Sequence, residues 1–270
     1  MPARCLFALT VLLLADLAVA TEVRIADRDS PGLIAAIEAA NAAATPTTIH
    51  LAEHGLYTLA SAADPDHQIG LPILRGSIRI DGHDAEIRRY ANADYTLIAI
   101  ATGAEVQLND LTLAEGSEGA LVNRGKVQLN RVKVVDNVAR TVSAIVENYG
   151  SIRIRDSEIS YNQLAGSQRD AGTVVNYGTL QLERTRIVGN VVSRRYDSLY
   201  AASAVLNFGK LHLHDVAIEE NAAEAILSAA ALGSIINLGT GNLEASALTL
   251  VNNEPPESNR IDTSDLRFHR

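Results

Sequence analysis

The chain has 270 residues, of which 47% are hydrophobic, and 23 basic against 32 acidic side chains give a formal charge of −9. This length is enough for one substantial hydrophobic core. An acidic balance with no basic cluster argues against nucleic acid or an anionic membrane as partner. The single cysteine, Cys5, excludes disulfide pairs and cysteine-based metal sites within the chain.

Residues 1–20 have the pattern of a secretory signal peptide. Arg4 supplies a basic start, residues 6–14 form an apolar run, and residues 18–20 (Ala-Val-Ala) make a small-residue cleavage motif. The apolar run is too short to anchor the chain across a bilayer, so we expect no membrane span after cleavage. The sequence therefore predicts a secreted, periplasmic or cell-surface protein that begins at Thr21.

Residues 21–48 are predicted to form a strand, at 22–26, followed by a helix. Ser30 and Pro31 suit the N-cap and first helical position, and Asn41 ends the helix. One face of this helix is apolar, made by Leu33, Ile34, Ile37 and Ala40. The end of a stack of repeats exposes its core and a sheet edge, so we expect this helix to cap the structure.

Residues 49–253 are organised by a repeat. An Asn-x-Gly tripeptide begins each regular unit, at Asn123, Asn148, Asn176, Asn207 and Asn237. A second asparagine follows 14 residues after each of the first four, at Asn137, Asn162, Asn190 and Asn221, and Asn253 completes the fifth unit if Gly241 takes the glycine position. Less regular units precede them, in residues 49–59 and after Gly76 and Ala104. Self-similarity at this period indicates a repeat architecture.

Within a unit, apolar residues lie two, four, seven and nine places after the glycine, as in Ile152, Ile154 and Ile159. Alternation of this kind predicts short strands with one buried face, on both sides of a tight turn. A third apolar strand precedes each Asn-x-Gly, whose glycine suits a positive φ. Such strands must pair with the next unit, so we predict an all-β, right-handed parallel β-helix of about seven three-strand coils. An α-solenoid, the competing repeat fold, does not fit a spacing of two. The chain ends in a polar tail, 254–270, after Pro255 and Pro256 stop the repeat.

The segment from Pro31 to Asn41, with Leu33, Ala36 and Ile37, resembles the "CSLREAI" N-terminal segment of secreted β-helix proteins. These belong to the pectate-lyase-like superfamily and include polymorphic outer-membrane proteins. The cysteine and the Arg-Glu pair of that segment are missing here. The resemblance implies a fold over residues 22–253 and a secreted or surface location, and it fixes no activity.

Most polar columns of the repeat have a structural explanation. Stacked asparagines can satisfy one another's amides, and charges of opposite sign on adjacent units, such as Asp156 and Arg184, can form cross-strand ion pairs. His212 and His214 share an outward face with Glu183 and Glu244, and we interpret them as a solvated surface and not as a metal site. We expect no metal and no cofactor.

The strand before each Asn-x-Gly is the candidate binding face. Its predicted outward residues are Val122, Glu147, Val175, Leu206 and Ile236, an apolar exterior that needs a cover or a partner. The proteins that the chain resembles carry a substrate cleft on this face. The candidate ligand-binding residues are Glu147, Tyr149, Tyr177, Phe208, Arg195 and Tyr196, which suit a polysaccharide or cell-surface partner. The alternative is that the protein's own corner loops cover this face.

Catalysis needs more than this face offers. Glycoside hydrolysis uses two converging carboxylates, and elimination uses a basic residue with acidic calcium ligands. Glu147 is the only strand carboxylate of the candidate face, so we assign no catalytic residue. The sequence favours a secreted, non-enzymatic β-helix protein with a surface-binding or structural role. A carbohydrate-active enzyme, a polysaccharide lyase or glycoside hydrolase, is the alternative. A third hypothesis is a passenger-like fragment of an adhesin.

Overall fold

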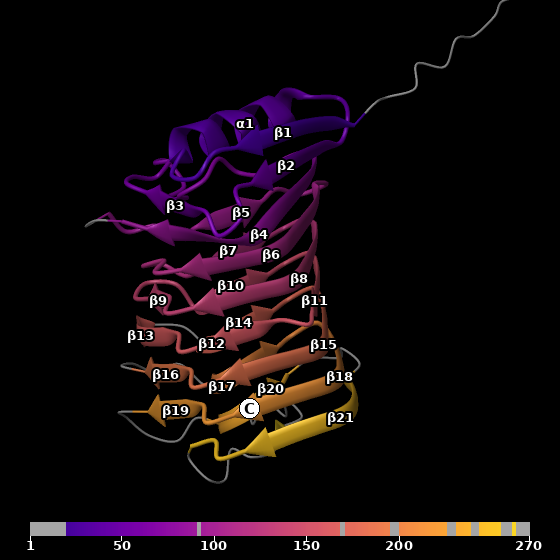
Figure 1. Ribbon diagram of the computed structural model, residues 1–270. Coiled ribbons are helices and arrows are strands. Elements are labelled where there is room, and N and C mark those ends of the chain that lie inside the picture. Colours follow the sequence, from indigo (N-terminus) through magenta and orange to yellow (C-terminus); the bar gives the residue numbers. More distant parts are fainter. Residues whose placement is uncertain are drawn as a thin grey trace, which may run out of the picture.

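The computed structural model describes residues 20–90, 93–167, 171–194, 200–225, 231–238, 243–254 and 261–262. Within them the protein is an all-β parallel β-solenoid of about seven turns with one helix. Figure 1 shows the strands stacked in one direction, from α1 and β1 at one end to β21 at the other. This agrees with the predicted number of coils.

The long sheet has 11 strands among the described residues, in the order β1-β2-β4-β6-β8-β11-β15-β18-β21, with β3 beside β4 and β12 between β8 and β15. From β6 to β21 the strands pair in parallel without a register shift. Their bounds are β1 Thr21–Ile25, β2 Thr47–Leu51, β3 Leu56–Leu59, β4 Ser77–Arg89, β6 Glu105–Ala114, β8 Lys126–Val135, β11 Ser151–Arg155, β12 Glu158–Ser160, β15 Thr179–Val188, β18 Lys210–Glu219 and β21 Leu243–Val251.

Two further sheets complete the coils. The second sheet runs in the order β22-β20-β17-β14-β10-β7-β5, and the short sheet in the order β19-β16-β13-β9. The second sheet consists of β5 Ile98–Ile100, β7 Leu121–Asn123, β10 Ala144–Asn148, β14 Ala171–Asn176, β17 Tyr200–Asn207, β20 Ala231–Asn237 and β22 Ile261–Asp262. The short sheet consists of β9 Val138–Ala139, β13 Gln163–Ser167, β16 Val191–Arg194 and β19 Ala222–Ala225. The described parts of the predicted tail therefore pair with the solenoid, Glu254 beside Ala222 and β22 beside β20.

The strands differ from the prediction at the tight turn inside each unit. In β8, β15 and β18 the two predicted strands form one strand, which bends at a residue in the left-handed region. These residues are Arg131, Arg184 and Asp215, with φ of 53°, 45° and 54°. The bend residue interrupts the alternation of the strand, so that side chains both before and after it can face the core. The short sheet was not predicted, because strands of two to five residues show too little alternation.

Two buried columns of asparagines run through the coils, as predicted. In the first column, Nδ2 of each asparagine donates to Oδ1 of the next, from Asn123 to Asn148 at 2.8 Å and then on to Asn176, Asn207 and Asn237 at 2.6 Å each. In the second, the same bond joins Asn137, Asn162, Asn190, Asn221 and Asn253 at distances from 2.8 to 3.0 Å. These bonds satisfy amides that burial would otherwise leave unpaired.

The glycine of the Asn-x-Gly turn is needed for a reason other than the predicted one. Gly150, Gly178 and Gly209 do not have a positive φ, which among the described glycines occurs at Gly103, Gly119 and Gly189. A Cβ at Gly178 would instead collide with the carbonyl oxygen of Gly150 in the preceding coil. The stacked turns approach too closely for any side chain.

The helix α1, Ser30–Ala42, begins one residue earlier than predicted. Asp29 is its N-cap, because Oδ1 of Asp29 accepts a hydrogen bond of 2.8 Å from the backbone N–H of Gly32. Pro31 takes an early helical position, as the sequence predicts. The cap shifts because a carboxylate at residue 29 satisfies an amide of the first turn that Ser30 does not reach.

The helix also continues past Asn41, whose side chain fixes the helix to the first coils. Oδ1 of Asn41 accepts from the Arg75 backbone N–H and Nδ2 donates to the Ile73 carbonyl, both at 2.8 Å. The fully buried Leu33 and Ile37 belong to the main core, which the inner faces of the coils form. Figure 1 shows α1 lying across the end of the stack beside β1. Among the described residues, no helix is long and apolar enough to cross a bilayer.

Candidate functional site

The aromatic residues of three successive turns form one stack, the aromatic stack, made of Tyr149, Tyr177 and Phe208. Each residue follows an asparagine of the first buried column, at the ends of β10, β14 and β17. Ring centroids are 4.9 Å apart between Tyr149 and Tyr177 and 5.0 Å apart between Tyr177 and Phe208, with interplanar angles of 9° and 4°. The register of the solenoid thus brings together three of the predicted binding residues.

Both faces of the Tyr149 and Tyr177 rings, and one face of the Phe208 ring, are occupied. Tyr177 lies between Tyr149 and Phe208. The guanidinium carbon of Arg124, in the preceding coil, lies over the Tyr149 ring, 4.7 Å from its centroid. Sugars and other flat ligands stack on ring faces, whereas this arrangement offers ring edges to solvent. Tyr149 and Tyr177 are 41% and 42% exposed. The rings of the aromatic stack therefore pack mainly against one another, and a ligand would meet hydroxyl groups and ring edges.

Glu147 lies beside the stack and binds two hydroxyl groups. The Tyr149 hydroxyl donates to Oε1 of Glu147 at 2.8 Å, and the Ser143 hydroxyl donates to the same oxygen at 3.2 Å. Burial, followed by the hydrogen bond to Glu147, raises the pKa of Tyr149 to about 12. The phenol therefore stays protonated at neutral pH and acts as a hydrogen-bond donor.

The apolar exterior predicted for this face is not exposed, which corrects the sequence analysis. Val175, Leu206 and Ile236 are fully buried and form a second apolar cluster with Ala144, Ala202 and Leu238, against which Tyr200 and Phe208 pack. Glu147 and Val122 are half-buried. A Cβ at Gly172 would lie 3.1 Å from Cβ of Leu206, so the start of β14 lies directly against that side chain. The protein covers its own apolar face here through residues of its strands, while residues 168–170 and 195–197 of the corner loops lie outside the described residues, so that cover by these loops stays a prediction.

Two of the predicted binding residues, Arg195 and Tyr196, lie outside the described residues, as do residues 1–19 of the predicted signal peptide. The binding role of all six predicted residues stays a prediction.

A second candidate surface lies on the outside of the long sheet, where the sequence analysis considered only the group around His212 and His214 and interpreted it as a solvated surface. One outward residue per strand lies in register from β2 to β18, and we call this set the outer column: Thr48, Arg79, Gln107, Gln128, Arg153, Gln181 and His212. Five of them occupy the third place after the glycine of their unit. Reading that place across the units would have revealed the column.

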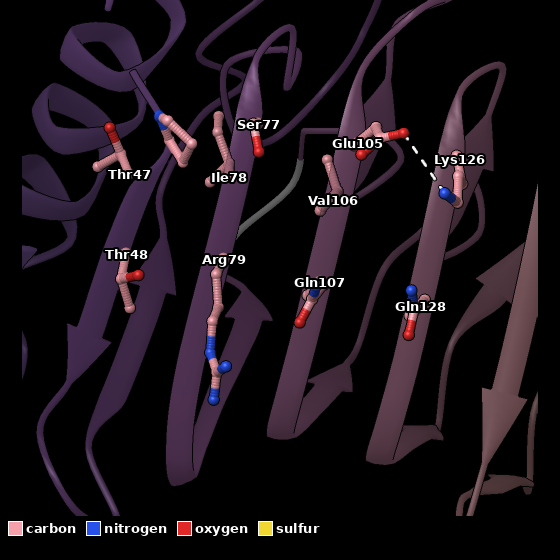
Figure 2. Close-up of a pocket in the computed structure, with 11 residues that line it drawn as sticks. Thr47, Thr48, Ser77, Ile78, Arg79, Glu105, Val106, Gln107, Lys126 and Gln128 are labelled. Carbon is pink, nitrogen blue, oxygen red and sulfur yellow. Dashed lines mark hydrogen bonds and ion pairs between the residues drawn. The ribbon is translucent and has the colours of Figure 1, made fainter. Parts of the chain in front are cut away.

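Two shallow depressions of the surface lie on this column. Figure 2 shows the first, where Arg79, Gln107 and Gln128 lie on three successive strands and Lys126 pairs with Glu105 at 3.4 Å. The second is lined by the outward residues of β15, β18 and β21, which are Gln181, Glu183, His212, His214, Glu244 and Ser246. Both depressions therefore present amide, hydroxyl and charged groups, and the second also presents the imidazoles of His212 and His214.

Charged side chains on the outside are paired from coil to coil. Asp110 binds Arg131, Asp156 binds Arg184 at 2.5 Å, and Arg186 contacts Glu158 at 3.3 Å. The predicted pair Asp156–Arg184 is thus confirmed, Glu158 and Arg186 pair across coils in the same way, and Arg131 pairs with the preceding coil. The hydrogen bond from the partner arginine lowers the pKa of Asp110 and of Asp156.

Glu183 shows the same effect on the outer face. Burial raises the pKa of Glu183, but hydrogen bonds from Arg153 at 2.6 Å and Arg155 at 3.0 Å outweigh it and leave the pKa lowered. His212 contacts Glu244 at 3.0 Å, and His214 contacts the hydroxyl of Ser246 at 2.9 Å. Across the part of the chain that is described, no three His, Cys, Asp or Glu side chains are grouped so that they could hold a metal ion.

Comparison with known proteins gives no relative. No family model matches the chain, and neither a curated protein nor a solved structure is significantly similar to it. The function must therefore be argued from the site itself.

Proposed function

We propose that this protein is exported and acts without catalysis, as a right-handed β-helix that binds a polysaccharide or another cell-surface component, or serves as a structural element there. In this proposal α1 caps the first coil. The burial of Leu33 and Ile37 in the main core supports the cap, because these side chains cover core that an open coil would expose. The resemblance of the α1 segment to secreted β-helix proteins supports export.

One observation supports the absence of catalysis: three outer carboxylates, Asp110, Asp156 and Glu183, are paired with arginines that favour their charged form. General acids and bases need pKa values near the working pH, and active sites shift carboxylates upward to reach it. In Asp110, Asp156 and Glu183 the shift goes the other way, to lower pKa values. Pairing of this kind suits stacking of coils, and it leaves these groups poorly suited to proton transfer.

An activity assay tests the proposal. Purified protein is incubated with polygalacturonate, alginate, xylan and β-glucan from about pH 4 to 9, and reducing ends and unsaturated products are measured. We expect no product above a heat-treated control. Product formation that is lost in Glu147→Gln would contradict the proposal and establish the carbohydrate-active enzyme instead.

The export part of the proposal has its own test, the N-terminal sequence of protein secreted by a host cell. β1 begins at Thr21, whose backbone N–H donates to the Pro46 carbonyl at 3.0 Å, so the folded part can begin there. We expect a mature N-terminus at Thr21. Recovery of an exported protein that begins at Met1 would count against cleavage of residues 1–20.

A further inference from the structure

The outer column contains amide groups that the protein itself does not use. Among the described residues, the side chains of Gln107, Gln128 and Gln181 make no hydrogen bond, although Gln107 and Gln128 lie directly opposite each other on β6 and β8. One place along the same strands, Asn130 donates to Asn109 and Asn109 donates to Asp81, both at 2.8 Å. Amides on neighbouring strands of this sheet can therefore pair, and these three glutamines of the outer column do not pair among the described residues.

Each free amide offers two donors and one acceptor to whatever lies on the sheet. The backbone groups of these strands are paired with neighbours on both sides, so only side chains can contact a ligand on this face. The column presents no large apolar or aromatic side chain, which protein interfaces use as their anchors. The chemistry of the column thus favours a hydroxyl-rich ligand over a protein.

The charges around the column cancel locally. Arg79 is bound by Asp81 at 2.8 Å, Lys126 pairs with Glu105 at 3.4 Å, and Arg153 is bound by Glu183 at 2.6 Å. A polyanion gains little from cations that are already neutralised, and the chain as a whole has a formal charge of −9. An uncharged ligand avoids this repulsion.

The geometry of the column suits an extended polymer. Its side chains repeat once per strand, about every 4.8 Å, and from Arg79 to His212 the column runs for about 24 Å along the axis of the solenoid. The two depressions lie on the two halves of this line. In a chain of sugars lying along the axis, about every sugar would contact one side chain of the outer column.

We propose that the outer column is a binding surface for an uncharged polysaccharide, which lies along the solenoid axis and is held by the amides of Gln107, Gln128 and Gln181. This inference rests on the proposed binding role and names the ligand class and the face. It places the ligand on the long sheet and not on the aromatic stack.

Affinity gel electrophoresis tests this surface, with mixed-linkage β-glucan, xyloglucan and galactomannan as neutral polymers and polygalacturonate as the acidic one. We expect at least one neutral polymer to retard the wild-type protein. The combined change Gln107→Ala, Gln128→Ala and Gln181→Ala should weaken that binding about tenfold or more, because several hydrogen bonds are lost. Gln163→Ala, an exposed glutamine on β13 of the short sheet, should leave it unchanged.

Three results would overturn the inference: no retardation by any neutral polymer, retardation by polygalacturonate alone, or equal affinity of the triple variant and the wild type. The melting temperature of the triple variant is measured in parallel, and Gln128→Leu alone replaces it if the triple variant melts lower. Unchanged binding by these variants would contradict the outer column as the binding surface without contradicting the proposed function. Product formation in the activity assay would contradict the proposed function without contradicting the outer column as a binding surface.

Discussion

Amide side chains inside and outside this solenoid have the same chemistry and opposite surroundings. Inside, Asn148, Asn176 and Asn207 are fully buried, and each bonds to the next at 2.6 Å. Outside, Gln107 and Gln128 face each other across two strands and make no bond among the described residues. Amides in register do not bond to one another for that reason alone. Burial favours the bond, because a buried amide without a partner is costly, whereas water satisfies an exposed amide.

The comparison teaches which side chains hold the fold and which remain available for a partner. Variants on the inside should therefore lose more stability than variants on the outside. The following changes probe that division, from the largest expected effect to the smallest.

Leu206→Ala should have the largest effect, since Leu206 is fully buried in the second apolar cluster. We expect the free energy of unfolding to fall by about 2–5 kcal/mol, from lost burial and the cavity left behind. Urea denaturation measures it. Val122→Ala, in the same column but half-buried, is the control and should lose far less. Equal losses would mean that Leu206 is not covered as described.

Asn176→Leu should cost about 1–3 kcal/mol, because it leaves Nδ2 of Asn148 without its oxygen acceptor at 2.6 Å and Oδ1 of Asn207 without its donor. Thermal and urea unfolding both report it. An unchanged stability would show that the column contributes nothing to the fold.

Tyr177→Ala should cost about 1–2 kcal/mol, because the ring loses stacking on both Tyr149 and Phe208. Tyr177→Phe keeps both ring contacts and should lose less. Polysaccharide binding should be the same in both variants if the outer column holds the ligand. Weaker binding in Tyr177→Ala, with stability retained, would instead indicate that the ligand binds at the aromatic stack.

Glu183→Gln should cost about 0.5–1 kcal/mol at pH 7, since it removes an ion pair with two partly exposed arginines. The pKa of Glu183 is lowered in the folded protein, so its stabilising effect is present above the ordinary value of 4.5 and is lost as the pH falls below it. The difference in melting temperature between variant and wild type should therefore shrink below that pH. A difference that is constant across pH would contradict the pairing with Arg153 and Arg155.

The repeat itself could be predicted from the sequence, because its signals are local and recur. The Asn-x-Gly turns and the second asparagines fix the coils, and both columns lie where they were expected. The need for Gly178 was predicted but its cause was wrong, because only the stacked structure shows how closely two turns approach.

The candidate site was harder to predict. Periodicity correctly placed Leu206 away from the inner face, but its burial depends on the apolar cluster that it forms with Ala202 of its own strand, β17, and with Ala144 of β10 in another coil. Apart from His212, the residues of the outer column were not predicted as a surface, because a lone glutamine such as Gln128 carries no signal. The role proposed for Gln128 depends on its neighbours in register on adjacent strands and on the absence of a hydrogen bond between the described side chains of Gln128 and Gln107.

The division between inside and outside is tested most directly by the unfolding free energies of Gln128→Leu and Asn176→Leu, measured side by side. Both changes replace an amide by the same apolar side chain on an in-register column. We expect Gln128→Leu to stay within about 0.5 kcal/mol of the wild type, as surface substitutions do, while Asn176→Leu loses about 1–3 kcal/mol. Equal losses, or a larger loss for Gln128→Leu, would contradict the account.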